Sequence, residues 1–357
     1  MQITLEGRIM SLVNNCQAFK LRTEYAQFHK NNPNVRIRTA AHALGVSELE
    51  LVAASAGTIS STPLRGPVQD ILKLLGSLER VMALSRNDWA VHERYGKYED
   101  VHAGNTMGIA LGADIDLRFF FKHWGTAWAV SDQGRRSIQF FDTGGTAIHK
   151  VFCTEETNVE AYDKLVNQFT DYDAPWPVIV AIDSDNHNLA NVAPQELRKR
   201  WMDMNDIHQF HRILKDLNVS RLTAFRGAGK DLAQRVDNEV VEKVLESVVQ
   251  KRIPLMCFVG NTGIVQIHSG TIQRLLRTGP WLNILDPIFN LHLDTTAIKQ
   301  SWLVSRPTSD GWVTSLECFA ASGDLVVQFF GARKPGNPEL KEWRDLLSSH
   351  AIDKLAA

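Results

Sequence analysis

The chain has few cysteines, no long apolar run and almost no net charge, and each shortage excludes a class of protein. Its four cysteines are scattered without Cys-x-x-Cys spacing, which excludes a disulfide scaffold and a cysteine-based zinc site. They are typical of reduced thiols in a cytoplasmic protein. No stretch reaches the roughly 18 apolar residues of a membrane span, and residues 1–6 lack a signal-peptide pattern. We therefore expect a cytoplasmic protein without membrane insertion.

The charges nearly cancel, because 39 basic residues face 40 acidic ones and leave a net charge of −1. No overall field attracts nucleic acid or anionic lipid, so such a partner needs a local patch. Apolar residues make up 44% of the 357 positions, enough for one large core or two ordinary ones. A globular protein is expected.

The sequence contains an internal duplication. Identical residues recur at an offset of 174, then of 178, with a looser offset of 184 upstream: Met82 with Met256, Asn87 with Asn261, Leu117 with Leu291, Trp128 with Trp302, Ser137 with Ser315, Phe152 with Phe330, Thr39 with Thr223 and Gly45 with Gly229. Chance identity would not keep one offset over such a span. We predict two homologous halves of about 150 residues, which is the size of a domain.

Each half begins with helical patterns and continues with short strand patterns joined by turns. The predicted segments are an N-terminal extension at 1–20, a first repeat at 21–171, a linker at 172–194 and a second repeat at 195–350. The extension is expected to be loose, and residues 178–182 are a candidate short strand within the linker. Because helices and hairpin-linked strands are segregated, the pattern favours the α+β class, with a large antiparallel sheet in each half.

Local signals place several ends of these elements. Gly45 is expected to end one helix, and Ser47 is expected to cap the next, with Glu48 and Glu50 in its first turn. The turn residues 142–145 separate two apolar strands and predict a hairpin. The first repeat therefore contains a helix pair followed by a meander of strands.

This helix pair also suggests an alternative function. Residues 39–50 have the spacing of a helix-turn-helix, and Arg36 and Arg38 precede it where phosphates would lie. A DNA-binding regulator is therefore one hypothesis. The two glutamates in the second helix stand where a recognition helix reads bases, so we interpret the pair mainly as scaffold.

The second copy carries a histidine pair that the first copy lacks. Residues 201–215 are predicted to form one amphipathic helix, from which His208 and His211 project at neighbouring turns. The equivalent first-repeat residues are Glu24 and Gln27. Surface histidines are the simple interpretation, and no third ligand for a zinc site follows nearby. A haem iron needs no third protein ligand, because the porphyrin supplies four nitrogens.

Arginines also differ between the copies or end their strands. Arg118 ends a strand-like run in the first copy, where the second has His292. Arg306 lies in a turn, and Gln328 and Arg333 lie in and after a late strand. Solvated surface positions would account for each one. Together they offer guanidinium groups suited to two carboxylates, as haem propionates require.

At this point the sequence resembles a known family. The resemblance runs in order from about residue 21 to 350 and rests on these stretches: 86–93, 116–120, 137–142, 259–261, 266–270, 281–284, 289–293 and 307–311. They are similar to the bacterial cytoplasmic haem-utilisation family, also called hemin-degrading factors. The resemblance implies a duplicated α+β fold and haem bound in the cytoplasm after import. It implies either delivery of haem to a haem oxygenase or opening of the ring.

The same resemblance assigns roles by position. It implies that His208 is the axial ligand of the haem iron, that Arg118 approaches the opposite haem face, and that His211 is an alternative ligand during transfer. Around the propionates it places Arg221, Gln328 and Arg333; in some members the position of His92 holds a second haem. Arg306 stands where many members have lysine, and Phe330 where several have tyrosine.

Two hypotheses share this site. A carrier would take haem from an inner-membrane importer and pass it to a haem oxygenase, and the histidine pair, suited to ligand exchange, favours it. An enzyme would open the ring with O₂, with Arg118 on the distal side and an external reductant, since no flavin or nicotinamide fingerprint is present. Without Cys-x-x-Cys-His the haem is expected to be non-covalent haem b. The two copies are expected to serve opposite faces of one haem.

Overall fold

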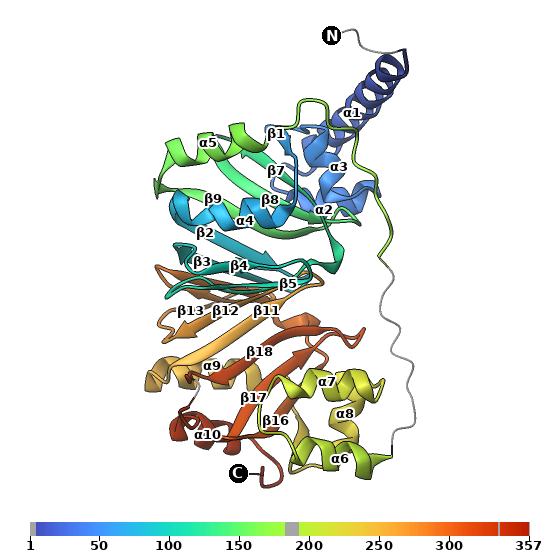
Figure 1. The fold of residues 1–357 in the computed structure, drawn as a ribbon. Helices are drawn as coiled ribbons and strands as arrows, with labels where there is room; N and C mark the ends of the chain where they lie inside the picture. Colours follow the sequence, from blue (N-terminus) through green and yellow to red (C-terminus); the bar gives the residue numbers. More distant parts are fainter. Residues whose placement is uncertain (1–4, 183–192, 335, 357) are drawn as a thin grey trace. The chain divides into compact units, whose positions relative to one another are not determined.

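The computed structural model describes residues 5–182, 193–334 and 336–356, with side chains from residue 16 onward. The first half of the chain forms α1 (Leu5–Asn31), α2 (Ile37–Leu44), α3 (Glu48–Ala53), β1 (Ile59–Leu64), α4 (Val68–Leu74), η1 (Leu75–Leu78), β2 (Glu79–Arg86), β3 (Ala90–Gly96), β4 (Val101–Ala103), β5 (Met107–Leu111), β6 (Asp116–Phe120), η2 (Phe121–His123), β7 (Trp124–Asp132), β8 (Arg135–Asp142), β9 (Ala147–Thr157) and α5 (Val159–Phe169) (Figure 1).

The second half repeats this order. It forms α6 (Pro194–Met202), α7 (Gln209–Asp216), α8 (Arg221–Ala228), β10 (Ala233–Val236), α9 (Val240–Lys251), β11 (Leu255–Gly260), β12 (Ile264–Gly270), β13 (Leu275–Thr278), β14 (Trp281–Leu285), β15 (Phe289–Asp294), η3 (Thr295–Ala297), β16 (Gln300–Thr308), β17 (Gly311–Phe319), β18 (Leu325–Gly331) and α10 (Lys341–Ser348). No helix among the described residues is long and apolar enough to cross a membrane.

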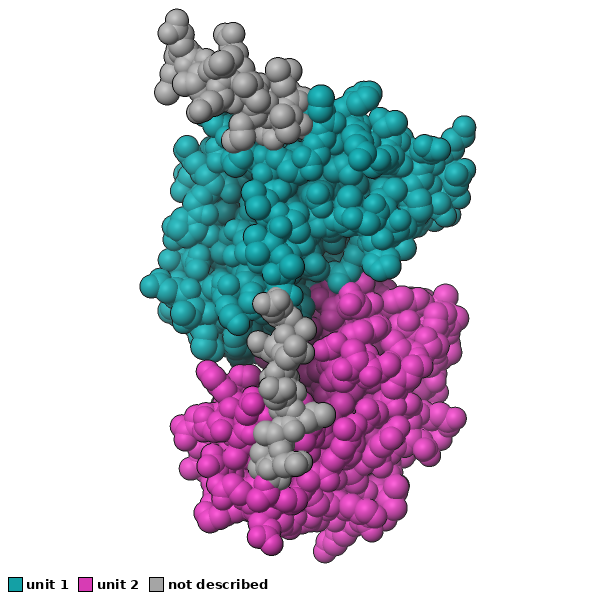
Figure 2. All heavy atoms as spheres, turned by 90° about the vertical axis from the view of Figure 1, so that its right-hand side faces the viewer, with its two compact units in different colours: residues 1–85, 94–182, 261–265 teal, residues 86–93, 183–260, 266–357 magenta. Residues whose placement is uncertain are grey.

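The chain divides into two compact units, coloured separately in Figure 2. Unit 1 comprises residues 1–85, 94–182 and 261–265, and unit 2 comprises 86–93, 183–260 and 266–357. Each unit has helices and antiparallel strands in the same order, which confirms the predicted α+β class and the duplication. Each unit also includes a short segment that follows a strand of the other repeat.

Unit 1 is a sheet with helices on both faces. Five of its strands run in the order β1-β7-β8-β9-β2, and β4, β5 and β6 also belong to this unit. Alternate residues of β7 face opposite ways: Trp128 and Val130 pack with α3, while Ala127 and Ala129 pack with α4 and α5. This alternation is the period of two that a strand imposes on its side chains.

Unit 2 is built in the same way. Its corresponding strands run in the order β10-β16-β17-β18-β11. Trp302 and Val304 pack with α6, α7 and α8, whereas Leu303 and Leu316 pack with α9 and α10. Figure 1 shows α6, α7 and α8 grouped beside β16 and β17. The predicted equivalence of Trp128 and Trp302 therefore holds in space, since each lies under the first helices of its repeat.

Strand register confirms the predicted offsets. In unit 1, Met82 of β2 pairs with Phe152 of β9. In unit 2, Met256 of β11 pairs with Phe330 of β18. Met82 and Met256 are related by the offset of 174, and their strand partners Phe152 and Phe330 by the offset of 178. A one-residue slip would have turned every side chain to the other face.

Two equivalent asparagines stabilise the turns that follow β2 and β11, in segments 86–93 of unit 2 and 261–265 of unit 1. In unit 2, the Asn87 amide donates to the carbonyl oxygen of Val326 at 2.9 Å and accepts from the backbone N–H groups of residues 89 and 90. In unit 1, the Asn261 amide donates to the carbonyl oxygen of Ile148 at 2.9 Å and accepts from the N–H groups of residues 263 and 264. The same turn chemistry, with the same partners, recurs in both copies.

Several expectations were wrong in detail. The regions predicted as helical contain a strand in each copy, β1 and β10. The polar, proline-containing sequence of β1 hides it, because proline is tolerated only at a sheet edge or strand start, and β1 pairs with β7 alone among the described strands. Residues 5–20 are not loose but belong to helix α1.

The predicted linker is only partly described. Residues 178–182 form no strand, although the N–H of Val180 donates to the carbonyl oxygen of Thr143 at 2.8 Å. Residues 183–192 of the linker lie outside the described residues. An apolar run alone did not make a strand here, because a strand also needs a hydrogen-bonded neighbour along its length.

The helix pair of the first repeat ends where predicted. Gly45 is the left-handed C-cap of α2 with φ of 69°, and Ser47 forms a capping box with Glu50 at the start of α3. Glu48 is buried and forms an ion pair with Lys150 of β9 at 2.5 Å. Because α3 has six residues and packs on the sheet, this arrangement does not favour the DNA-binding hypothesis.

A buried histidine distinguishes unit 1 from unit 2. His149 lies between the Ser85 hydroxyl, 2.8 Å from Nδ1, and the Tyr98 hydroxyl, 2.5 Å from Nε2. Burial lowers the pKa of His149 to about 3 from 6.5. The equivalent residues of the second copy are apolar: Val259, Val327 and Ile272. The imidazole is therefore held neutral inside unit 1.

This cluster predicts acid sensitivity. A histidine with a lowered folded pKa binds its proton in the unfolded chain first, so stability falls as the pH drops from about 6.5 towards 3. Between pH 8 and pH 5 the loss should be about 2 kcal/mol. Replacing the cluster by its second-copy counterparts (Ser85→Val, Tyr98→Ile, His149→Val) should reduce that pH dependence in urea unfolding. The exposed-site variant His42→Gln is the control.

Direct titration keeps the prediction testable if the triple variant does not fold. The imidazole signals of His149 in the natural protein should stay those of a neutral ring down to about pH 4. Titration near pH 6.5 would contradict it.

Candidate functional site

The histidine pair lies at a helix start, and not within one long helix. The helix predicted for 201–215 is interrupted after Met202, and His208 is the N-cap of α7. Short polar side chains cause the break, because they bond to nearby backbone in place of the helical pattern. Asp206 accepts from the His208 N–H at 2.8 Å, and the Asn205 and Gln209 amides bond to each other at 2.9 Å.

Asp206 orients the His208 ring. Its Oδ1 lies 2.7 Å from Nδ1 of His208, whose side chain is 83% exposed. With Nδ1 donating to a carboxylate, the lone pair of Nε2 faces outward, as in most histidines that ligate metals. The pKa of Asp206 is lowered, first because it accepts the His208 N–H and then by the hydrogen bond to the ring. His211, one turn later, is also exposed.

The loop that carries His208 is fastened to the turn between β16 and β17. The Ser309 N–H donates to the Asn205 carbonyl oxygen at 2.8 Å. In the same turn Asp310 lies 3.9 Å from the guanidinium of Arg333, and Arg333 also lowers the pKa of Asp206. Nη1 of Arg333 is buried without a hydrogen-bond partner. The turn therefore ties the loop to the strand end that carries this arginine.

Beneath α7 lies a buried ion triad. Glu317 of β17 has no exposed surface and binds Nη2 of Arg306 at 2.6 Å and Nη1 of Arg221 at 2.9 Å. The guanidinium of Arg306 also lies over the ring of Phe210, 4.4 Å from its centre. Arg221, at the start of α8, is 27% exposed, whereas the side chain of Arg306 is 3% exposed. Arg221 therefore reaches solvent and Arg306 does not.

The charges of the triad decide its protonation. Burial alone raises the pKa of Glu317, but Arg306 and Arg221 outweigh it and lower the pKa to about 2 from 4.5. Burial lowers the pKa of Arg306, and Glu317 opposes that shift. The triad of Glu317, Arg306 and Arg221 therefore carries one net positive charge at neutral pH, beside the ring of Phe210 in α7.

The remaining positions of the predicted site in unit 2 differ in exposure. Gln328 is half-buried and lies opposite Glu317 on the neighbouring strand. Phe330 packs edge-on against Phe258 with ring centres 5.1 Å apart. His92 is fully buried and lies 4.9 Å from the ring of Phe289, so its ring presents no surface to a second haem.

Arg118 belongs to unit 1. It lies on β6 and is one-third exposed, and its guanidinium donates to the carboxylate of Asp116 and to the Leu117 carbonyl oxygen. Both bonds are made within its own strand. The described residues contain no group of three or more histidine, cysteine or acidic side chains placed to hold a metal ion.

Two side chains of the candidate site were not singled out from the sequence. One is Asp206, although an acid two residues before a candidate ligand is a recognisable signal for an oriented histidine. The other is Glu317, which lies in a continuously buried stretch of β17, residues 313–319. A charged residue in such a strand predicts a buried partner of opposite charge, but the sequence does not say which cation supplies it.

Removing the central carboxylate should destabilise unit 2. Glu317→Gln leaves two cations close together, one of them buried, and should cost about 3–5 kcal/mol. Because the folded pKa of Glu317 is about 2, its contribution is complete above about pH 4.5 and is lost as the pH falls towards 2. Urea unfolding at pH 7 measures the first effect. Glu239→Gln, which breaks an exposed pair, is the control and should change stability by under about 0.5 kcal/mol.

A compensated variant separates charge from packing. Glu317→Leu combined with Arg306→Met should be closer to the natural stability than Glu317→Gln, because no buried charge is left alone. Equal losses in both variants would contradict the triad as the source of the effect.

Comparisons with known proteins agree with the duplicated fold. The family described as the haemin-degrading HemS.ChuX domain matches residues 45–169 and again 218–350, once in each repeat. The hemin transport protein HemS of Yersinia enterocolitica is 37% identical over 327 residues, covering 90% of this chain and 94% of the relative.

Solved structures are similar over nearly the whole chain. Holo-PhuS, a heme-binding protein from Pseudomonas aeruginosa, has a TM-score of 0.90 at 38% identity and covers 93% of this chain and 99% of its own. The heme degrading enzyme ChuS of Escherichia coli O157:H7 has a TM-score of 0.86 at 33% identity, with coverage of 93% and 99%. The chain belongs to the haemin-degrading HemS/ChuX domain family of haem-utilisation proteins.

Proposed function

We propose that the protein is a cytoplasmic haem carrier of iron acquisition, which takes imported haem b without a covalent bond and delivers it to a haem oxygenase. The observation that carries the proposal is the exposed His208 ring held by Asp206. A carboxylate on Nδ1 fixes the ring and leaves Nε2 free, which suits the axial ligand of an iron. The haem-binding relatives support haem as the ligand.

Cations around this histidine fit a dicarboxylate ligand. Arg221 and Arg333 offer guanidinium groups in unit 2, and Nη1 of Arg333 is a buried donor without a partner. A propionate would supply the missing acceptor through a charge-assisted hydrogen bond. Because Arg306 is enclosed and bound to Glu317, we propose that it positions Arg221 and Phe210 and does not touch the ligand.

The exposed second histidine favours transfer over retention. His211 lies one turn from His208 on the solvent side of α7, so the iron would exchange ligands without the helix moving far. The alternative function is ring opening, since one relative is called a heme degrading enzyme. There, bound haem would supply the redox centre for O₂, and the protein would need an external reductant. The role of Arg118 on the other haem face stays a prediction.

One experiment decides between carrier and enzyme. Haemin is bound to the purified protein, and the visible spectrum is followed with ascorbate in the presence of catalase, which removes free peroxide. A stable Soret band, with rapid transfer of haem to an added haem oxygenase, is the carrier result. Decay of the band with release of iron and a linear tetrapyrrole would contradict the carrier proposal and show that the protein is a haem-degrading enzyme.

The ligand assignment predicts graded effects of three substitutions. His208→Ala should change the haem spectrum and weaken binding, more so in a His211→Ala background. Asp206→Asn should keep the fold and weaken haem binding about tenfold, because ligand orientation is lost while the ligand remains. Asp216→Asn, an exposed acid at the end of the same helix, is the matched control.

Two outcomes of these measurements would contradict the ligand assignment. An unchanged spectrum and affinity in the double histidine variant would show that His208 does not ligate the iron. Equal effects of Asp206→Asn and Asp216→Asn would show that the oriented ring is not what matters.

A further inference from the structure

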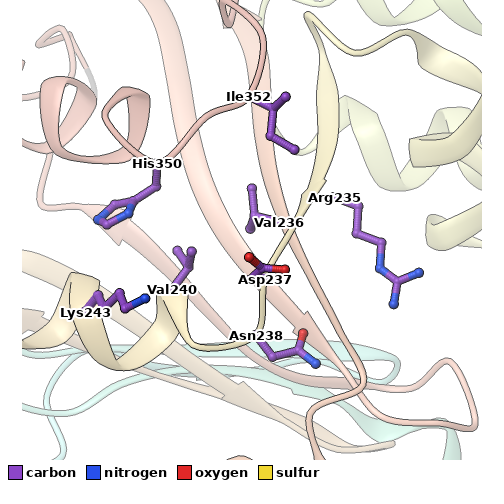
Figure 3. A pocket seen from close by; sticks show the side chains of 8 residues that line it. All are labelled: Arg235, Val236, Asp237, Asn238, Val240, Lys243, His350 and Ile352. Atoms are coloured by element: carbon purple, nitrogen blue, oxygen red, sulfur yellow. The ribbon is translucent and has the colours of Figure 1, made fainter.

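Unit 2 contains a cavity that none of the predicted haem residues lines. Its volume is about 490 Å³, and its walls come from the end of β10, the following turn, the first turns of α9 and the segment after α10. The lining residues are Arg235, Val236, Asp237, Asn238, Val240, Lys243, His350 and Ile352 (Figure 3). A cavity of this size is in the range that holds metabolites, roughly 300–1,000 Å³.

The first repeat is closed at the equivalent place. Pro63 of β1 pairs with Trp128, as Arg235 of β10 pairs with the equivalent Trp302. After α5 the chain bonds directly to the end of β1: the Asp171 N–H donates to the Pro63 carbonyl oxygen at 3.0 Å, and the Arg65 N–H donates to that of Phe169 at 2.7 Å. Backbone hydrogen bonds therefore fill this position in unit 1.

The second repeat replaces these bonds by one side chain. The amide of Gln234 accepts from the N–H groups of Ile352 and Asp353 at 2.7 and 3.1 Å and donates to the Asp353 carbonyl oxygen at 2.9 Å. A glutamine side chain holds the strand and the segment after α10 further apart than direct backbone bonding does. The cavity is therefore a difference between the copies that specific residues maintain.

A lysine and a histidine lie on one side of this cavity. His350 and Lys243 lie on the same side in Figure 3, with Arg235 on the other side and Asp237 between. Burial, followed by the charges of Lys243 and Lys251, lowers the pKa of His350. Among the described residues, Lys243 forms an exposed ion pair with Glu239 at the start of its own helix, at 3.0 Å, and such a pair costs little to break.

We propose that this cavity binds a small organic anion, a carboxylate or phosphate ester of metabolite size, with Lys243 and His350 holding its anionic group. Buried Val236 and Val240 contact the carbon skeleton of the ligand, and Asp237 accepts from a hydroxyl on it. An anion beside His350 favours the protonated imidazole, so binding takes up a proton and tightens as the pH falls. The carboxylates of Asp237 and Glu239 repel the bound anion, but they do not oppose protonation of His350.

The test uses the full-length protein with sulfate as the head-group probe and L-malate as the organic probe. Calorimetric titration at fixed ionic strength is expected to show saturable binding of both, with malate tighter. Sulfate keeps its charge between pH 6 and pH 8, so several-fold tighter sulfate binding at pH 6 reports proton uptake by the protein.

Variants assign the binding to the cavity. Lys243→Gln combined with His350→Gln is expected to abolish both signals and the pH dependence, while leaving the Soret spectrum of bound haem unchanged. Lys199→Gln removes an exposed lysine that pairs with Asp203 elsewhere in unit 2 and is the matched control. Absence of saturable binding, or equal binding by the double variant and the natural protein, would overturn the proposal. An altered haem spectrum in the double variant would do so as well, by assigning the cavity to haem.

Discussion

The two arginines between α7, α8 and the sheet of unit 2, Arg306 and Arg221, depend on one buried carboxylate, Glu317. Without it Arg306 would be a lone buried charge, a state that proteins avoid because desolvation costs several kcal/mol. With it, Arg306 packs over Phe210 and Arg221 is held at the start of α8 with part of its guanidinium in solvent. The position of α7, and so of His208, rests on this arrangement, because Phe210 belongs to the first turn of that helix.

Equivalent rows of side chains across the two sheets form ion pairs of opposite polarity with a helix. In unit 1 the row contains Trp128, Gln139 and Lys150, and the lysine binds Glu48 of α3. In unit 2 the equivalent row contains Trp302, Glu317 and Gln328, and the acid binds Arg221 of α8. Both rows tie a helix to the sheet, but the sheet supplies the cation in one and the anion in the other. The anionic sheet residue of unit 2 therefore holds two arginines, Arg221 and Arg306, beside α7.

Divergence after duplication also explains the other differences. A buried histidine cluster in unit 1 is apolar in unit 2, and backbone bonds that close unit 1 are replaced by Gln234 in unit 2. Neither change alters strand order, because register depends on the alternating apolar residues that both copies keep. Positions outside that alternation could therefore differ between the copies without a change of fold.

The sequence by itself determined the duplication, through identities at fixed offsets, and the α+β class, through the order of helical and strand patterns. It also determined the helix ends at Gly45 and Ser47, through local capping. It misjudged the helix around His208, where Asn205 and Asp206 bond to neighbouring groups, and it missed the edge strands β1 and β10. Only the tertiary structure decided that Arg306 is enclosed and Arg221 open, that both pair with Glu317, and that His92 is buried. Exposure and pairing depend on residues distant in the chain, which no local pattern records.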